Sequence, residues 1–470
     1  MLGFFCGFFD LSRIFHYRLI DSSTTIFLKL QSKRKTSMRF IIVMVTLILC
    51  SCGPTENNSP KNIILLIGDG MGEAEIALTR AYEYDGDPDL FVDSMQNRGS
   101  VIVKQLREKD PSKFQFTGES AGGATTIATG QRTSDGRIST TAKYGVALKT
   151  ILEEAIEKGF KTGLVTTAII TDATPAAFAA HATNRYCFMR GDAICGEDTP
   201  IIEQMLNHNV DVMIGGGLEL LKAKDQNGRL ISQMATDLGY QVITERETLL
   251  NLPKGTKTLG IFAEHHMPTE WQGYQGRSAQ VVPLGDDGRI LYPKAQRCEI
   301  NPEHQGIPSL EEMTVTALNT VTSDQGPGFF LMIEGALIDK QAHIAKPCGT
   351  IGAMLAFDRS VKIAMDYAKK HGNTAVIVTA DHGTSTQVIY RPEVKDDQLD
   401  HDNMPGKYEA LLSRNGSIVN AYYGTNNADD QSHTGVNVPI YSYGFAKDVP
   451  ITGLIEQSDI YAVMKNFLFN

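Results

Sequence analysis

The chain has 470 residues, of which 42% are hydrophobic and 21% charged, and its formal net charge is −10 with a pI of about 5.6. These proportions are ordinary for a globular protein, and the length suffices for a large core. The acidic balance leaves no electrostatic basis for a nucleic-acid-binding surface. An anionic substrate would therefore need local positive charge from arginine or metal ions.

The N-terminal region contains a pattern typical of lipoprotein export signals. Met38-Arg39 precedes an apolar run over 40–49, which is too short to span a membrane, and small residues lead to Cys52. This pattern predicts that residues 38–52 are an export signal and that Cys52 carries lipid as the first mature residue. The protein would then be periplasmic or attached to the outer membrane, and only the lipid would anchor it. The alternative is an ordinary cleaved signal with incidental cysteines.

The remainder of the chain is interpreted as one domain behind a short leader. Residues 1–37 contain stretches that no export signal needs, so we interpret them as a non-native or mis-called extension, and residues 53–60 as a short tether. No composition break, repeat or low-complexity tract divides residues 61–470, which predicts a single domain. Two less periodic stretches, near 215–300 and 391–432, are expected to be loop excursions.

Apolar runs of strand length alternate with amphipathic helical stretches along this domain. Strands are predicted over 62–67, 161–165, 210–214, 329–333, 374–378 and 438–443, and helices over 148–158, 200–207, 310–321 and 351–370. This alternation indicates an α/β fold with a mostly parallel sheet covered on both faces. Functional sites in such sheets lie beyond the carboxyl ends of the strands.

The first strand ends in Gly68-Asp69-Gly70, which would present Asp69 at the strand end, although Asp–Gly is also a common turn. Further along, Ser120 opens a small-residue stretch that ends at Gly130, a pattern typical of a short helix. Free N–H groups at such a helix start could hold an anion, whereas the simpler interpretation is a serine cap.

The segment 171–185 follows a predicted strand and combines several polar side chains. Thr174 before Pro175 fits a helix start with proline at the first helical position. Asp172 and Thr174 offer oxygen ligands suited to magnesium, and Arg185 offers a planar fork for two phosphate oxygens. His181 lies in an alanine-rich stretch, and we favour a structural role for it.

The four cysteines after Cys52 favour disulfides, because an even number in an exported protein is typical of them. Cys187 and Cys195 enclose a short loop and are the easiest pair, which leaves Cys298 with Cys348. As metal ligands, the four would need tighter spacing than this.

A predicted strand over 329–333 is followed by Glu334, Asp339 and His343. On a helix, Asp339 and His343 would share one face, as zinc ligands do. Asp381-His382 follows the strand over 374–378. On a turn, these neighbours can reach one ion.

His433 precedes the last predicted strand, in Ser432-His433-Thr434-Gly435. Alone it would be interpreted as an ordinary surface histidine. In the company of the other strand-end segments, it becomes a candidate ligand.

Together the motifs GDGMG, ESAGGAT, DATPAAFAAHATNR, EGALIDKQAH, TADHG and SHTG, in this order, resemble those of the alkaline phosphatase family. The resemblance extends over residues 60–470. It implies a three-layer α/β/α sandwich around a large mixed sheet, two zinc ions, one magnesium ion, and hydrolysis of phosphate monoesters through a phosphoserine on Ser120. The two cysteine pairs match positions of bacterial family disulfides. Homodimers are common in the family, although no motif here specifies one.

The resemblance also implies a role for each candidate residue. The first zinc ion would be held by Asp339, His343 and His433. The second would be held by Asp69, Asp381 and His382, with Ser120 completing its shell. Magnesium would be bound by Asp69, Thr174 and Glu334, with Asp172 acting through water. Phosphate would be bound by Arg185, and through water by Lys340.

The sequence departs from the family at Glu119, where the family usually has Asp immediately before the nucleophile. The longer side chain is expected to shift Arg185 and to affect substrate affinity and rate. Asp172 stands where many relatives have His, which indicates true magnesium at that site.

Other functions fit parts of the same pattern. A phosphodiesterase or sulfatase of the same superfamily would use similar segments, but Thr174, Glu334 and Arg185 together favour monoesters. Gly118-Glu-Ser-Ala-Gly122 also fits the G-x-S-x-G elbow of a carboxylesterase, although the preceding Lys113–Phe116 is a weak strand. A lipid-anchored binding protein would use the metal structurally, but structural zinc sites are closed and usually rich in cysteine.

Overall fold

The computed structural model describes residues 61–282, 291–323, 325–389, 406–445 and 451–470. The predicted extension, export signal, lipid-bearing Cys52 and tether lie outside the described residues. So do 283–290 and 390–405, which belong to the two stretches predicted as excursions.

A ten-stranded mixed sheet forms the centre of the domain, in the order β17-β2-β16-β12-β1-β11-β5-β6-β8-β7. Its strands are β1 (Lys61–Gly68), β2 (Asn97–Ile102), β5 (Lys161–Ile169), β6 (Val212–Gly216), β7 (Gln241–Ile243), β8 (Thr258–Ile261), β11 (Gly328–Gly335), β12 (Thr374–Thr379), β16 (Val438–Tyr443) and β17 (Gly453–Glu456). All pairs are parallel except those of β16, which is antiparallel to both neighbours. The predicted mostly parallel sheet is confirmed.

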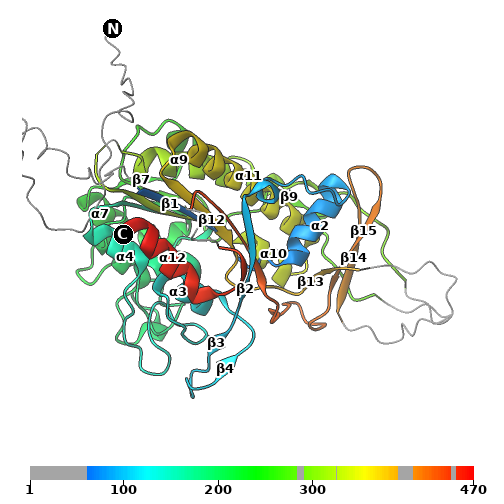
Figure 1. Cartoon of the computed structure of the whole chain (residues 1–470), viewed down its shortest axis with the longest axis horizontal. Helices are drawn as coiled ribbons and strands as arrows, with labels where there is room; N and C mark the ends of the chain where they lie inside the picture. The colour runs from blue at the N-terminus through cyan, green and yellow to red at the C-terminus, as the bar shows by residue number, and fades with distance from the viewer. Residues whose placement is uncertain (1–60, 283–290, 324, 390–405, 446–450) are drawn as a thin grey trace, which may run out of the picture. The chain divides into compact units, whose positions relative to one another are not determined.

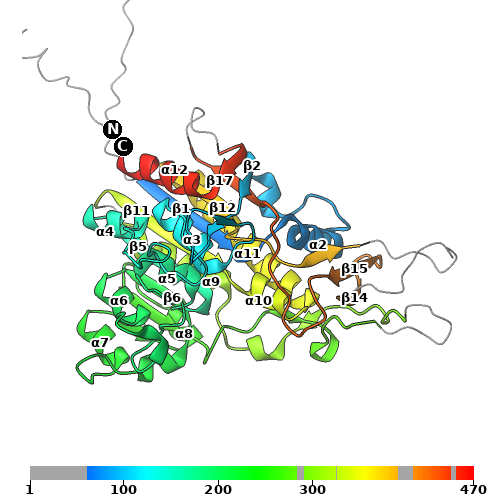
Figure 2. The same cartoon turned by 90° about the horizontal axis from the view of Figure 1, so that it is seen from below.

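Helices cover both faces of this sheet, which confirms the predicted three-layer sandwich (Figures 1 and 2). One layer contains α9 (Leu310–Val321) and α11 (Pro347–His371). The other contains α3 (Ser120–Thr129), α4 (Ile151–Glu157), α5 (Ala173–Ala179) and α12 (Gln457–Phe469).

Shorter elements connect the layers and extend from them. The other helices are α2 (Glu73–Tyr84), α6 (Ile201–Asn207), α7 (Ile231–Asp237), α8 (Arg246–Leu250) and α10 (Leu337–His343). The other strands are β3 (Gln105–Leu106), β4 (Phe114–Gln115), β9 (Trp271–Gln272), β10 (Glu299–Ile300), β13 (Thr386–Val388), β14 (Lys407–Leu412) and β15 (Ile418–Tyr423).

Two local predictions are corrected by the structure. The stretch 215–300 is not only a loop excursion, because β7 and β8 extend the main sheet. The sequence did not predict these two strands, because strands this short carry little hydrophobic periodicity. Pro175 is the third residue of α5 rather than the first. The helix starts earlier because the Asp172 carboxylate accepts a hydrogen bond from Ala173 N, and a proline in the first turn leaves no helical bond unmade.

The central strands are buried on both faces, as continuous apolar runs require in a covered parallel sheet. Residues 63–67 of β1 are 0% exposed. Gly68 pairs with Gly335 and Ile67 with Thr379, so β1, β11 and β12 end at the same level. The residues that follow these three strands therefore come together at one edge of the sheet.

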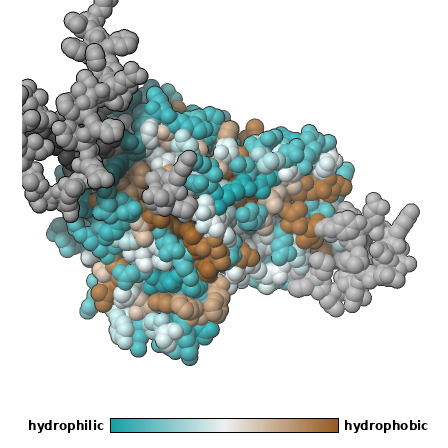
Figure 3. Space-filling view, viewed as in Figure 1, coloured by the Kyte–Doolittle hydropathy of each residue, from teal (hydrophilic) through white to brown (hydrophobic). Residues whose placement is uncertain are grey.

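Several groups of hydrophobic residues lie among hydrophilic ones on the face seen in Figure 3. Exposed hydrophobic residues in the described ranges include Phe116, Val436 and Leu454. Within the ranges that the structure describes, no helix is both long and apolar enough to cross a lipid bilayer.

Two disulfides, Cys187–Cys195 and Cys298–Cys348, agree with the predicted pairs and close loops of very different length. Because cross-linking restricts the unfolded chain more when the loop is longer, we expect the replacement of both Cys298 and Cys348 by alanine to cost about 4 kcal/mol for a separation of 50 residues. The same change at Cys187 and Cys195, with a separation of 8, should cost about 2.5 kcal/mol. Denaturant titration of both double variants measures the difference, and a reversed ranking would contradict this account.

Candidate active site

The candidate functional side chains gather beyond the carboxyl ends of the three central strands. Asp69 follows β1, and Asp381 and His382 follow β12. The helix α10 begins immediately after β11 and carries Asp339 and His343 on successive turns. These side chains therefore lie close together, because each one follows a strand that ends at this edge of the sheet.

Asp339, His343 and His433 form a first group that could hold a metal ion. His343 Nε2 lies 3.3 Å from Asp339 Oδ2 and 2.9 Å from His433 Nε2, and His433 Nε2 lies 3.5 Å from Asp339 Oδ1. Ligands about 2.0–2.1 Å from a tetrahedral zinc ion stand about 3.3 Å apart. The spacing of the three side chains is therefore that of ligands to one ion.

Hydrogen bonds on the far side of both imidazoles orient this group. His343 Nδ1 lies 2.6 Å from the carbonyl of Gln431, and His433 Nδ1 lies 2.8 Å from that of Gly118. A carbonyl only accepts, so each Nδ1 carries hydrogen, and Nε2 is the ring nitrogen that faces Asp339. Two ring nitrogens that face one carboxylate need a shared proton or cation between them.

A second group contains Asp69, His382 and Ser120. His382 Nε2 lies 3.2 Å from Asp69 Oδ1 and 3.2 Å from Ser120 Oγ, and the Ser120 and Asp69 oxygens are 3.4 Å apart. Asp339 also lies within reach of Asp69 and His382, so it borders both groups. The predicted ligand Asp381 is adjacent, with Oδ2 at 3.6 Å from His382 Nε2.

This arrangement differs from a serine-hydrolase triad. In a triad the serine and the acid bind opposite nitrogens of the histidine. Here Ser120 and Asp69 both approach Nε2 of His382, whereas Nδ1 faces the carbonyl of Gly383 at 3.4 Å. The convergence on one nitrogen is the geometry of ligands around a cation, and it disfavours the carboxylesterase alternative.

A third cluster of oxygen atoms surrounds Glu334. The Thr166 hydroxyl donates to its carboxylate, and Thr174 Oγ1 is buried without a hydrogen bond of normal geometry from the described residues. Burial and the nearby charges of Asp69 and Asp172 raise the pKa of Glu334 well above its ordinary value. Hydroxyl and carboxylate oxygens of this kind suit a hard cation such as magnesium.

Asp381 is, like Glu334, a buried acid whose ionised form is not fully compensated by positive charge. Burial and the charges of Asp69 and Asp339 raise the pKa of Asp381 well above its ordinary value. Asp339 Oδ1 and Asp381 Oδ2 are buried and form no hydrogen bond with the described residues. The donor types, their spacing and these unpaired atoms fit bound divalent cations.

Ser120 lies at the start of α3, as predicted, and Gly130 ends this helix in the left-handed conformation. Glu119 is the N-cap, and its side chain accepts a hydrogen bond from Gly122 N. The hydroxyl of Ser120 is buried, at 2% exposure of the residue, and faces Asp69 and His382. A serine held at a helix N-terminus lies in a field that favours anions.

Glu119 joins the nucleophile helix to Arg185. One carboxylate oxygen pairs with Arg185 Nη1, and the other accepts from Gly122 N at 3.2 Å and Gly136 N at 3.0 Å. Burial opposes ionisation, but the Arg185 charge and the backbone N–H groups lower the pKa of Glu119. The longer acid is therefore accommodated through Gly136, a contact that local sequence did not reveal.

A second carboxylate holds the other end of the guanidinium. Arg185 Nη2 donates to Asp172 Oδ1 at 2.9 Å, and Arg185 Nε is buried without a partner among the described residues. Lys340 Nζ lies between Asp172 and Asp69, at 3.4 Å and 3.3 Å. Both predicted phosphate-binding cations thus lie at the site, each held by acids.

His181 is outside this site, in agreement with the structural role that we favoured. Its Nδ1 lies 2.9 Å from the carbonyl of Ser139, and its Nε2 lies 2.9 Å from Glu153. It fastens the segment before Arg185 to α4. Sequence reasoning did not identify Thr166 or the carbonyl of Gln431, because neither has a distinctive neighbour in the chain.

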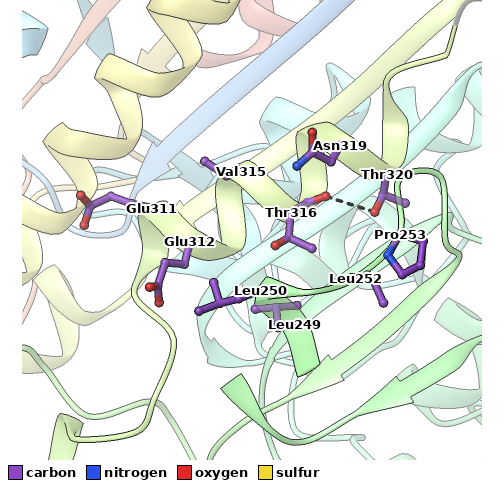
Figure 4. A pocket seen from close by; sticks show the side chains of 10 residues that line it. All are labelled: Leu249, Leu250, Leu252, Pro253, Glu311, Glu312, Val315, Thr316, Asn319 and Thr320. Atoms are coloured by element: carbon purple, nitrogen blue, oxygen red, sulfur yellow. Dashed lines mark hydrogen bonds between the residues drawn. The ribbon is translucent and has the colours of Figure 1, made fainter. Parts of the chain in front are cut away.

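A surface groove lies away from this site, between α8 and α9 (Figure 4). It encloses about 220 Å³ and is lined by Leu249, Leu250, Leu252, Pro253, Glu311, Glu312, Val315, Thr316, Asn319 and Thr320. Its two acids pair with arginines, Glu311 with Arg359 and Glu312 with Arg246. The groove therefore offers apolar surface but no free catalytic group.

Comparisons with known proteins agree with this geometry. A family model described as alkaline phosphatase matches residues 60–469. The chain is 36% identical over 449 residues to streptomycin-6-phosphate phosphatase of Streptomyces griseus. The aligned region covers 90% of this chain and 94% of that protein. It is 36% identical over 431 residues to alkaline phosphatase of Escherichia coli, and the aligned region covers 86% of this chain and 85% of that protein.

Solved structures share the fold. Alkaline phosphatase from the Antarctic bacterium TAB5 superposes with a TM-score of 0.65 at 24% identity, over 87% of this chain and 98% of that one. Alkaline phosphatase from Thermus thermophilus superposes with a TM-score of 0.66 at 20% identity, over 89% of this chain and 94% of that one.

Metal affinity at this site should depend on pH. Burial alone would lower the pKa of His343, but the hydrogen bond and charge of Asp339 raise it to about 9 in the metal-free protein. Below this pH a proton must leave His343 before a metal ion can bind, so zinc affinity should rise by about tenfold per pH unit between pH 7 and 9. Competition with a chelator of known affinity measures this slope. An affinity that stays constant over this interval would contradict the assignment of His343 as a ligand.

Proposed function

The chain belongs to the alkaline phosphatase family and is a phosphatase, and from this we propose that it hydrolyses phosphate monoesters through a phosphoserine on Ser120. The observation that carries the proposal is the position of Ser120 Oγ, buried between Asp69 and His382. Arg185 is tied to the same helix through the preceding residue, Glu119.

The reaction consists of two displacements at phosphorus. Ser120 Oγ forms a bond to phosphorus while the ester P–O bond breaks and the alcohol leaves. Water then attacks the phosphoserine, the Ser120 Oγ–P bond breaks, and inorganic phosphate is released with the serine regenerated. Two inversions would retain configuration at phosphorus overall.

Arg185 binds the phosphoryl oxygens in this scheme. Its guanidinium is fixed by Glu119 and Asp172, which supports a preorganised fork and reduces the entropy lost on binding. Lys340 adds a second positive charge close to Asp69 and Asp172. These two cations supply the local positive charge that an acidic protein needs for an anionic substrate.

We propose that zinc ions are held by two sets of side chains, Asp339, His343 and His433 in the first, and Asp69, Asp381, His382 and Ser120 in the second. Asp69, Glu334 and Thr174 would hold magnesium, with Asp172 acting through water. When bound, such ions lower the pKa of a hydroxyl nucleophile and stabilise the entering and leaving oxygens. The chain's own part is to hold Ser120 Oγ against Asp69 and His382 and to keep that hydroxyl buried.

Export, lipidation of Cys52, a single catalytic domain over 61–470 and a homodimer remain proposals that rest on the sequence pattern and on family membership. A tethered enzyme of this kind would act on small phosphate esters outside the cytoplasm. No described helix supplies an alternative membrane anchor.

The direct test uses purified residues 53–470 with an aryl phosphate at alkaline pH. We expect turnover that a chelator abolishes and that zinc and magnesium restore. Ser120→Ala should reduce kcat by at least about a thousandfold, because the covalent route is lost. Mass spectrometry after acid quench should detect phosphate on Ser120 in the parent protein. Chelator-resistant hydrolysis of an acyl ester, or preferred hydrolysis of a diester, would contradict the proposal.

Arg185→Lys tests the role of the guanidinium. Lysine keeps the charge but cannot bind Glu119, Asp172 and phosphate in a planar fork, so KM for the aryl phosphate should rise by about 10- to 100-fold. The inhibition constant of inorganic phosphate should rise in parallel. The matched control is Arg190→Lys, on a nearby arginine that pairs with Glu203 and lies outside the site. Equal effects of the two variants would exclude a specific role for Arg185.

A further inference from the structure

Two fully buried glutamines bind the backbone at the site. Gln105 Nε2 donates to the carbonyl of Glu119 at 2.6 Å, and Gln457 Nε2 donates to the carbonyl of Asp381 at 2.8 Å. Both side chains belong to residues that are 0% exposed. One carbonyl immediately precedes Ser120, and the other belongs to a candidate metal ligand.

Strand pairing brings these glutamines to the same edge of the sheet. Within the parallel pair β2–β17, Ile102 lies opposite Glu456, so the chain leaves both strands at the same level. Gln457 is the next residue after Glu456 and begins α12, whereas Gln105 begins β3 three residues after Ile102. The two amides therefore reach the site from one side, although they are far apart in sequence.

The first turn of α3, which carries Ser120, packs against the Gln105 amide and against the carbonyl that Gln457 binds. A Cβ atom at Gly122 would lie 2.6 Å from Gln105 Cδ, and a Cβ atom at Gly123 would lie 2.7 Å from the Asp381 carbonyl oxygen. The backbone of α3 thus packs directly on the Gln105 amide and on the carbonyl that Gln457 binds. No side chain larger than hydrogen fits at Gly122 or Gly123 without displacing these groups.

Packing alone does not account for amides at these positions. The Oε1 atoms of Gln105 and Gln457 are buried and form no hydrogen bond with the described residues. Burying an unpaired amide oxygen costs free energy that a hydrocarbon side chain of similar volume would avoid. What the amides add is a directed N–H bond that fixes the position of one carbonyl each.

We propose that Gln457 and Gln105 are positioning residues of the active site. Gln457 anchors the Asp381–His382 turn from the C-terminal helix, so that both side chains stay oriented toward a metal ion. Gln105 anchors the backbone before Ser120, so that Oγ stays aligned with Asp69 and His382. This inference rests on the proposed function for the roles of the metal ligands and of Ser120.

The test compares Gln457→Met, which keeps the volume and removes the donor, with Asp459→Ala. Asp459 accepts a hydrogen bond from Glu456 N and caps the same end of α12, whereas it is Gln457 that binds the Asp381 carbonyl. Both variants should lower the thermal stability. At a temperature well below either unfolding transition, zinc release to a colorimetric chelator should be about tenfold faster in Gln457→Met only.

Gln105→Met and Gln457→Met should differ in their kinetic effects. Gln105→Met should lower the rate of Ser120 phosphorylation by about tenfold, measured in single-turnover experiments, while zinc release stays at the parent rate. Gln457→Met should change both quantities.

The inference would be overturned if Gln457→Met and Asp459→Ala released zinc at the same rate, or if Gln105→Met phosphorylated Ser120 at the parent rate. The zinc-release measurement does not require turnover. If the parent protein bound zinc but hydrolysed no phosphate ester, the proposed function would fail while the positioning role of Gln457 could still be decided.

Discussion

Electrostatic repulsion between buried carboxylates is the constraint on which the rest of the structure depends. Asp69, Glu334, Asp339 and Asp381 are each at most 1% exposed, and they converge at the carboxyl ends of three adjacent strands. Such a group is unfavourable in a low-dielectric interior unless cations compensate it. Lys340 and Arg185 supply part of that compensation, and the carboxylate oxygens that form no hydrogen bond with the described residues are suited to the cations that we propose for the site.

A rigid support is needed to keep like charges close together. The buried ladder of β1, β11 and β12 provides it, because its parallel register aligns the residues at which the strands end. These parts were predictable from the sequence. Each apolar run predicts a strand, and the polar residues that follow, such as Asp69 and Asp381-His382, belong to the site by position alone. Asp339 and His343 were predictable for the same reason, because their helical spacing is local.

Other parts of the site were not predictable, because they depend on contacts between distant segments. Glu119 binds Gly136, and a single glycine in a loop carries no signal of that contact. Gln105 and Gln457 are isolated glutamines whose partners become visible only when β2 and β17 pair. The start of α5 was misplaced because the capping strength of Asp172 outweighed the preference of proline for the first helical position.

The position of Asp339 affects how metal ions would occupy the site. Asp339 lies against His343 and His433 on one side and belongs with Asp69 and His382 to the neighbouring group. If a single carboxylate rotates toward one ion, its interaction with the other ion changes as well. Occupation of the two proposed positions would therefore be thermodynamically linked, and the linkage would be reciprocal: whatever the first ion does to the affinity of the second, the second would do equally to the first.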